Sequence, residues 1–237
     1  MIIDIHNHLG VRPGAKQTPE ELLEKMNKAG VDKCVIFPQT RTYPNDVVLK
    51  ATKDYPDKFI GMIMVNPWHG DTKDKLREGF EAGFTGLKLH PYVDSFPLDY
   101  HELLDPIFKI CEEYNAPIIC HGSGDNPYSM PQQFEEMAKT FPNVVLIMAH
   151  MGRVWAVDAA IRIASRNKNI YLGTSSTNTS NIEKAVEEAG AEKILMGTDS
   201  PFNRHELEIQ KMKLAIKNPN DLKKVLGENA SKIFLKK

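Results

Sequence analysis

Short apolar runs alternate along this chain with segments whose apolar residues recur every three or four positions. Eight such runs have the length of buried strands, and a longer amphipathic segment typical of a helix follows each one. Strands that alternate with helices in this way favour a parallel sheet. The runs cover residues 2–5, 33–37, 59–65, 86–90, 117–121, 144–150, 169–173 and 193–197.

The helical segments carry start and stop signals. Thr18 is a candidate N-cap, followed by Pro19 at the first helical position and by Glu21 three residues after the cap, and Gly30 ends that helix. Gly83 ends another helix in the same way. The remaining helices are expected over residues 45–54, 71–82, 100–114, 131–140, 154–166, 182–189, 204–217 and 221–235.

The eight strand and helix units follow one another without a linker or a change of composition. A chain of 237 residues is also close to the roughly 250 residues that an α/β barrel needs. We therefore expect an α/β protein with one domain over residues 1–237, folded as a single (β/α)8 TIM barrel. A doubly wound open sheet would show the same alternation, so the element count alone leaves that architecture open.

Polar residues gather at the carboxyl ends of the expected strands. Asp199 follows the eighth run, and five of the eight histidines end or follow a strand. In a (β/α)8 barrel these strand ends meet at one mouth, where the active sites of this fold lie. The five are His6, His8, His90, His121 and His150.

The first run, Asp4-Ile-His-Asn-His8, places two histidines two positions apart. Alternate residues of a strand face the same side, so His6 and His8 are expected on one face, together with Asp4. The other three histidines lie in a loop or near helix starts and are assigned no special role. They are His69, His101 and His205.

A divalent metal ion explains this collection of side chains. Imidazoles and carboxylates suit Zn²⁺, Mn²⁺ or Fe²⁺, and we expect one ion, most simply Zn²⁺. The expected ligands are His6, His8, His121 and Asp199. Such an ion lowers the pKa of its bound water from 15.7 to about 7, or polarises a substrate oxygen. Asp199 could accept the proton of that water, and His150 could act as a general acid or base.

Each of these signals is weak alone. A lone His-x-His pair or a single histidine at a strand end is more often a core or surface residue than a metal ligand. Five such histidines together with Asp199 favour the metal site, because buried polar groups without partners are costly.

The composition narrows the classes of binding partner that are expected. With 30 Lys and Arg against 31 Asp and Glu, the net charge of -1 gives no basic track for nucleic acid. The sequence has no apolar run of about 18 residues for a bilayer and no signal-peptide pattern. Three cysteines without Cys-x-x-Cys spacing indicate reduced thiols, so a cytoplasmic protein is expected.

Taken in order, the motifs of this chain resemble the amidohydrolase superfamily, and specifically its amidohydrolase-2 group of TIM-barrel hydrolases and decarboxylases. The resemblance spans nearly the whole chain. The motifs are Asp4-Ile-His-Asn-His8, Gly86-Leu-Lys-Leu-His-Pro91, Ile119-Cys-His-Gly122, Ala149-His-Met-Gly152, Gly197-Thr-Asp-Ser-Pro201 and Glu228-Asn-Ala-Ser-Lys-Ile-Phe234. By this resemblance His6, His8, His121 and Asp199 bind the metal, and His150 stands beside the reacting water or substrate.

Lys88 is ambiguous. In other branches of the superfamily a lysine on strand four is carboxylated and bridges two metals, whereas the amidohydrolase-2 group usually holds one. We therefore favour Lys88 as an uncarboxylated charged residue of the active site, with a lysine at the barrel rim as an equal alternative. His90 shares its face by strand parity and is a further candidate for substrate binding.

Arg41 follows strand two and could hold a substrate carboxylate, as an arginine at a comparable place does in related decarboxylases. Arg153 and Arg204 are weaker candidates for the same role. Cys120 is expected to face away from His121, towards the helices. Trp68 and Trp155 could line a pocket, although packing is their default role.

The first hypothesis is a metal-dependent hydrolase that uses an activated water on a small carboxylated or cyclic ester or amide substrate. The alternative is a metal-dependent, non-oxidative decarboxylase of a small unsaturated or aromatic acid. A non-catalytic metal-binding protein is a remote third reading. TatD-like DNA hydrolases also begin with His-x-His, but they place a glutamate after strand four, where this chain has Lys88 and His90. Short loops leave room for a homo-oligomer in which a neighbour completes the pocket.

Overall fold

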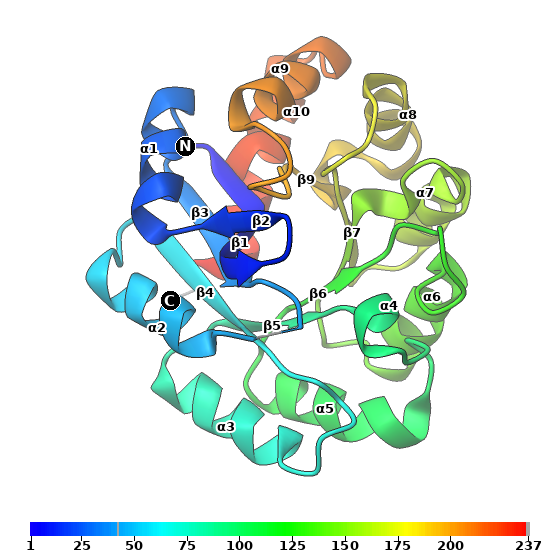
Figure 1. The fold of residues 1–237 in the computed structure, drawn as a ribbon. Coiled ribbons are helices and arrows are strands. Elements are labelled where there is room, and N and C mark those ends of the chain that lie inside the picture. Colours follow the sequence, from blue (N-terminus) through cyan, green and yellow to red (C-terminus); the bar gives the residue numbers. More distant parts are fainter. Residues whose placement is uncertain (42, 236–237) are drawn as a thin grey trace.

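The computed structural model describes residues 1–41 and 43–235. In them one curled sheet has the strand order β2-β1-β3-β4-β5-β6-β7-β8-β9, and helices surround it (Figure 1). All neighbours pair in parallel except β1 and β2, which form an antiparallel hairpin. The strands are β1 Ile3–Arg12, β2 Ala15–Gln17, β3 Lys33–Pro38, β4 Phe59–Met64, β5 Gly86–Leu89, β6 Ile118–His121, β7 Leu146–Ala149, β8 Ile170–Gly173 and β9 Ile194–Leu195.

Backbone hydrogen bonds close the sheet into a barrel. The amide of Ile5 on β1 donates to the carbonyl of Met196 just after β9, at 3.0 Å. Three residues further along β1, the amide of His8 donates to the carbonyl of Ser200 at 2.8 Å. A doubly wound open sheet has two free edges, so these bonds confirm the predicted TIM-barrel fold over that alternative.

The helices lie close to the expected ranges. Thr18 caps α1 in a capping box with Glu21, and Gly30 ends the helix in a left-handed conformation, as predicted. The predicted helix over 221–235 is instead two short helices joined by a π-helical turn, Lys224–Glu228. The helices are α1 Pro19–Ala29, α2 Asn45–Asp54, α3 Thr72–Ala82, α4 Pro91–Asp94, α5 His101–Glu113, α6 Pro131–Thr140, α7 Val157–Arg166, α8 Thr179–Ala189, α9 His205–Ala215, α10 Pro219–Lys223 and α11 Asn229–Phe234.

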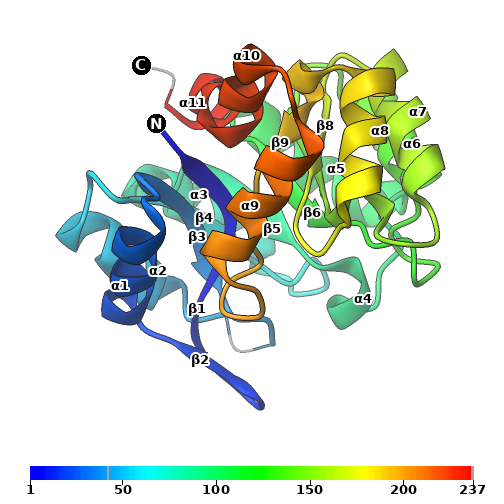
Figure 2. The same cartoon turned by 90° about the horizontal axis from the view of Figure 1, so that it is seen from above.

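Two apolar layers hold the barrel together. One layer fills the space between strands and helices and includes Cys34 and Cys120. The other fills the barrel interior, where side chains such as Ile5 and Ile147 meet Phe234 of α11. In Figure 2, α11 and the N-terminus lie at one end of the barrel, and the β1–β2 hairpin and α4 lie at the other. The interior is therefore closed at the α11 end and leaves the opposite end for a site.

The first strand departs from the prediction in two ways. It continues to Arg12 and turns back through β2, an extension that we did not predict because the run beyond His8 is not continuously apolar. The expectation that Asp4 shares a face with His6 and His8 is also wrong. A β-bulge interrupts the register between Asp4 and Asn7, so Asp4 contacts Thr198 and His205 outside the barrel while both histidines face inward.

No helix among the described residues combines the length and the apolar character that crossing a bilayer requires.

Candidate metal centre

The residues that the sequence placed at strand ends line one cavity. This inner cavity has a volume of about 310 Å³ and lies at the barrel end opposite α11. Side chains from seven strand ends contribute to it, although they are up to 197 positions apart in sequence. The lining residues are His6, His8, Arg12, Thr40, Lys88, His90, His121, His150, Arg153, Ser176, Asp199, Phe202 and Asn203.

Three of the predicted metal ligands converge within this cavity. The Nε2 atoms of His6 and His8 lie 3.1 and 3.3 Å from one carboxylate oxygen of Asp199. One donor atom from each of the three lies within 4.8 Å of the others. Two imidazole nitrogens and a carboxylate at this spacing form a donor set that suits a divalent transition metal.

Each of the two histidines has a polar partner at its far ring nitrogen, Nδ1. Nδ1 of His8 lies 3.1 Å from the carbonyl oxygen of Pro38, which can only accept, so Nδ1 carries the proton. Nδ1 of His6 lies 3.2 Å from the hydroxyl of Ser175. Such partners on the far ring nitrogen orient a metal-binding histidine, and the carbonyl of Pro38 also fixes the tautomer of His8. We missed Ser175 because a serine in a loop carries no local signal of this role.

His121 stands apart from this group of three. Its Nε2 lies 2.9 Å from the hydroxyl of Ser123, which in turn hydrogen-bonds to the carboxylate of Asp125. The carboxylate accepts the serine proton, so the serine oxygen accepts from Nε2–H of His121. The free lone pair of His121 is thus on Nδ1. Its role as a fourth ligand stays a prediction.

His150 lies beside the three ligands. Its ring centroid is 5.0 Å from that of His6, and 4.7 Å from that of His121. Its Nδ1 donates to the carbonyl of Ser175 at 3.2 Å, which leaves the lone pair on Nε2. His150 and Asp199 both have left-handed backbone conformations, with φ of 65° and 66°. Residues held in such strained conformations often cluster at functional sites.

Burial favours the neutral form of three imidazoles at this site. Burial lowers the pKa of His6 and His121 well below the usual value, and that of His150 to about 4. Burial alone would raise the pKa of Asp199, but the imidazoles of His6 and His8 that face its carboxylate hold it well below its ordinary value. Neutral imidazole and ionised carboxylate are the forms that bind metal, so the donor set fits a divalent ion at neutral pH.

Lys88 lies inside the barrel rather than at its rim. Its side chain is fully buried, and Nζ has no hydrogen-bond partner among the described residues. The ammonium group lies 5.0 Å from the ring centroid of Phe37, and burial lowers its pKa to about 8. His90 is partly buried, and its ring stacks on that of His121 with centroids 4.1 Å apart.

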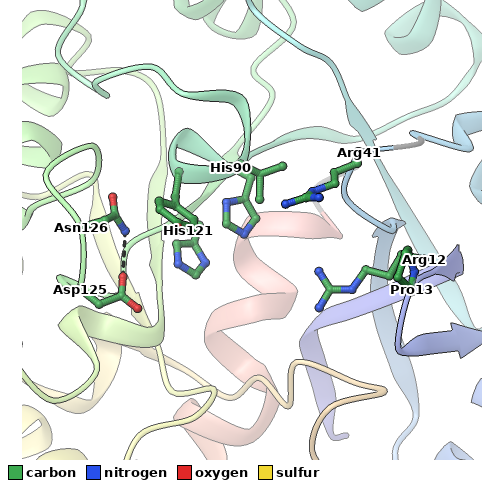
Figure 3. Close-up of a pocket in the computed structure, with 9 residues that line it drawn as sticks. Arg12, Pro13, Arg41, His90, His121, Asp125 and Asn126 are labelled. Atoms are coloured by element: carbon green, nitrogen blue, oxygen red, sulfur yellow. Dashed lines mark hydrogen bonds between the residues drawn. The ribbon is translucent and has the colours of Figure 1, made fainter.

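An outer cavity of about 550 Å³ shares Arg12, His90 and His121 with the inner one. Figure 3 shows the guanidinium groups of Arg12 and Arg41 on the side opposite Asp125 and Asn126. Nη1 of Arg12 donates to the hydroxyl of Thr40 at 3.1 Å. Other lining residues are Pro13, Tyr92 and Val93.

Arg12 is a site residue that we did not predict. It lies four and six positions after His8 and His6, so strand parity would have placed it on their face if β1 had been extended. Of the other arginines, Arg153 lines the inner cavity and Arg204 lines neither cavity.

Three further expectations have clear outcomes. Trp68 and Trp155 line neither cavity and are 50% and 80% exposed. Cys120 lies in the layer between strands and helices, away from the cavity, as predicted. His205, to which we assigned no special role, begins α9 as expected, and it is buried and lies 3.1 Å from a carboxylate oxygen of Asp4.

The family model described as amidohydrolase matches residues 3–235. The chain belongs to the amidohydrolase family. The resemblance read from its motifs is therefore confirmed, and membership is consistent with an enzyme. No curated protein sequence matches this amidohydrolase.

Solved structures with the same fold include enzymes of two reaction classes. The 2,6-dihydroxybenzoate decarboxylase from Rhizobium has a TM-score of 0.80 and 16% identity, covering 99% of this chain and 98% of that one. A probable 2-pyrone-4,6-dicarboxylic acid hydrolase from Acinetobacter baumannii has a TM-score of 0.76 and 17% identity, and the match covers 99% of each chain. The 5-carboxyvanillate decarboxylase from Novosphingobium aromaticivorans, complexed with manganese, has a TM-score of 0.78 and 17% identity. That match covers 100% of this chain and 96% of the decarboxylase chain. These likenesses show the fold of this amidohydrolase.

Replacing Lys88 with methionine should stabilise the metal-free protein. The folded-state pKa of about 8 lies below the ordinary 10.5, so the buried charge costs up to about 3 kcal/mol below pH 8. Between pH 8 and 10.5 the unfolded chain still holds a proton that the folded protein has lost, and the penalty fades. The free energy of unfolding, measured with urea, should therefore differ most between variant and wild type below pH 8.

The exposed Lys109→Met variant is the control and should show no such pH-dependent difference. A stability gap between Lys88→Met and wild type that stays constant from pH 7 to pH 10.5 would contradict the assignment of a buried ammonium group.

Proposed function

We propose that this amidohydrolase is a metal-dependent hydrolase of a small substrate, either a carboxylated compound or a cyclic ester or amide, and that it uses a metal-activated water. The observation that carries this proposal is the convergence of His6, His8 and Asp199 on one point of a cavity, with His150 beside them. A divalent ion, when bound there, supplies a Lewis acid that activates water or polarises a substrate oxygen.

The proposal assigns one metal ion to His6, His8 and Asp199, with His121 as the fourth ligand. Zn²⁺ suits this nitrogen and oxygen donor set, and Mn²⁺ and Fe²⁺ are the alternatives. Support for Mn²⁺ comes from the manganese in the structurally similar 5-carboxyvanillate decarboxylase. A second ion on a carboxylated Lys88 is disfavoured, because its Nζ lies over the ring of Phe37 without a polar partner among the described residues.

Side chains of the chain itself would move the protons. His150 is neutral at pH 7, and the lone pair on its Nε2 can accept a proton or a hydrogen bond from the reacting group. Asp199, held ionised, is the second acceptor. Lys88, at the inner cavity, favours an anionic oxygen of the substrate nearby.

The outer cavity supports a carboxylated substrate. Arg12 and Arg41 present two guanidinium groups to it, and guanidinium binds carboxylate by paired, charge-assisted hydrogen bonds. A substrate that reaches from these arginines to Asp199 would pass the stacked rings of His90 and His121. We propose that these rings contact its flat or apolar part.

The same arginines support decarboxylation as a second candidate function. In that reaction a carbon–carbon bond breaks, CO₂ leaves, and a proton takes its place on the substrate carbon. The structural likeness to two decarboxylases favours keeping this alternative.

A cytoplasmic location remains part of the proposal and is supported by three buried cysteines that form no disulfide.

Purified protein reconstituted with Zn²⁺ should hold about one ion per chain, measured by elemental analysis. The variants His6→Ala and His8→Ala should each lose it, because each removes one of the converging nitrogen ligands. His101→Ala is the matched control, since His101 lies on the surface and pairs with Asp105. Wild-type protein that takes up no transition metal after reconstitution would overturn the proposed function.

The reaction class can be decided by its products. We expect a panel of lactones, amides and aromatic or unsaturated acids to yield acid release with incorporation of ¹⁸O from labelled water, measured by mass spectrometry. Gas release should be absent, because hydrolysis breaks no carbon–carbon bond. Evolution of CO₂ without ¹⁸O in the product would instead establish the decarboxylase.

Arg12→Gln and Arg41→Gln should raise the KM for a carboxylated substrate about tenfold to a hundredfold, because each removes a charge-assisted hydrogen bond worth about 1.5–3 kcal/mol. The kinetics with a neutral amide of the same acid should change little. Arg166→Gln, which alters a surface arginine paired with Glu135, is the control. Equal losses on charged and neutral substrates would contradict carboxylate binding by the two arginines.

A further inference from the structure

A buried polar network lies directly behind the metal centre, on the outer side of the barrel wall. Asp4 on β1 and His205, the first residue of α9, are 0% and 1% exposed. Nε2 of His205 lies 3.1 Å from Oδ2 of Asp4. Neither residue lines the inner or the outer cavity. Because burying a carboxylate is costly unless it is hydrogen-bonded, the contacts of Asp4 indicate what this group does.

The Asp4 carboxylate joins the two segments that carry the metal ligands. Its Oδ1 accepts the backbone N–H of His6 at 2.9 Å and the backbone N–H of Thr198 at 3.0 Å. Its Oδ2 accepts the hydroxyl of Thr198 at 2.6 Å. Thr198 immediately precedes Asp199, so one carboxylate fixes the backbone at His6 and next to Asp199.

His205 extends the same network to the residue between the two histidine ligands. Its Nε2 lies 3.1 Å from the side-chain oxygen of Asn7. The amide nitrogen of Asn7 donates to the carbonyl of Val35 on β3 at 3.2 Å, so the oxygen is the group that faces His205. An oxygen acceptor on Asn7 and a carboxylate on Asp4 both require a proton on Nε2 of His205. The start of α9 is thereby linked to β1 at the bulge.

We propose that Asp4 and His205 are positioning residues that set the spacing of His6 and Asp199, and therefore the metal affinity, from outside the cavity. The bulge in β1 and the left-handed backbone of Asp199 are conformations that a free chain would rarely adopt. The Asp4 carboxylate bonds to the backbone beside both, which holds them in register. This inference rests on the proposed metal-dependent function.

The test compares Asp4→Ala and Asp4→Asn with wild type. Zn²⁺ affinity is measured by competition with a chromophoric chelator, and ligand geometry by the visible absorption of Co²⁺-loaded protein. We expect Asp4→Ala to bind Zn²⁺ about a hundredfold more weakly and Asp4→Asn about tenfold, within the range usual for residues that orient metal ligands. The smaller loss follows because the amide oxygen can still accept from the N–H groups of His6 and Thr198. Both variants should show an altered Co²⁺ spectrum.

Cys34→Ala is the matched control. Cys34 is buried in the same cluster, with Sγ 4.0 Å from Nε2 of His205, and it forms no hydrogen bond to His6 or Thr198. This variant should lower the Tm and leave the Zn²⁺ affinity and the Co²⁺ spectrum unchanged.

The inference would be overturned if Asp4→Asn kept both the Zn²⁺ affinity and the Co²⁺ spectrum of the wild type. This outcome decides the test even when Asp4→Ala does not fold. An equal loss of affinity in Cys34→Ala would overturn it as well, because the effect would then reflect general destabilisation. Failure of the wild type itself to bind metal would instead count against the proposed function.

Discussion

The site depends on the junction at which the first strand meets the segment after the last one. Bonds from Ile5 to Met196 and from His8 to Ser200 close the barrel there. The same contacts bring Asp199 opposite His6, although the two residues are 193 positions apart in sequence. The hydrogen bonds that close the barrel therefore also assemble the donor set. They join the segment that carries His6 and His8 to the segment that carries Asp199.

Burial then gives this junction its chemical character. The apolar interior below the cavity, which ends at Phe234, excludes water from the lower faces of the imidazoles and from Lys88. Burial favours the neutral form of His6, whereas the carboxylate of Asp199 stays ionised because two histidines face it. Lys88, with a pKa of about 8, stays charged at neutral pH at the wall of the same cavity. The fold therefore combines one anionic donor with imidazole donors, an arrangement that attracts a cation.

Periodicity predicted the eight strands and the histidines at their carboxyl ends, but it left a doubly wound open sheet as an alternative to the barrel. Apolar runs mark strands wherever both faces are buried, and a histidine at the carboxyl end of such a strand lies at the mouth of a barrel. What periodicity could not provide was the bulge in β1, which moves Asp4 to the outer face. It also could not provide Arg12 or Ser123, because a hairpin extension and a hydroxyl behind a ring depend on contacts between distant segments. His205 looked like an ordinary helix start for the same reason.

The extended first strand has a consequence for how such enzymes can diversify. It carries His6 and His8 near its middle and Arg12 at its tip, on a hairpin that Figure 2 shows projecting from the barrel. Each residue of a strand advances about 3.3 Å, so adding two residues to the hairpin would carry the guanidinium group some 7 Å outward and leave the histidines where they are. The position of Arg12 at the barrel mouth can thus change while His6 and His8 stay in place, although one strand carries all three residues.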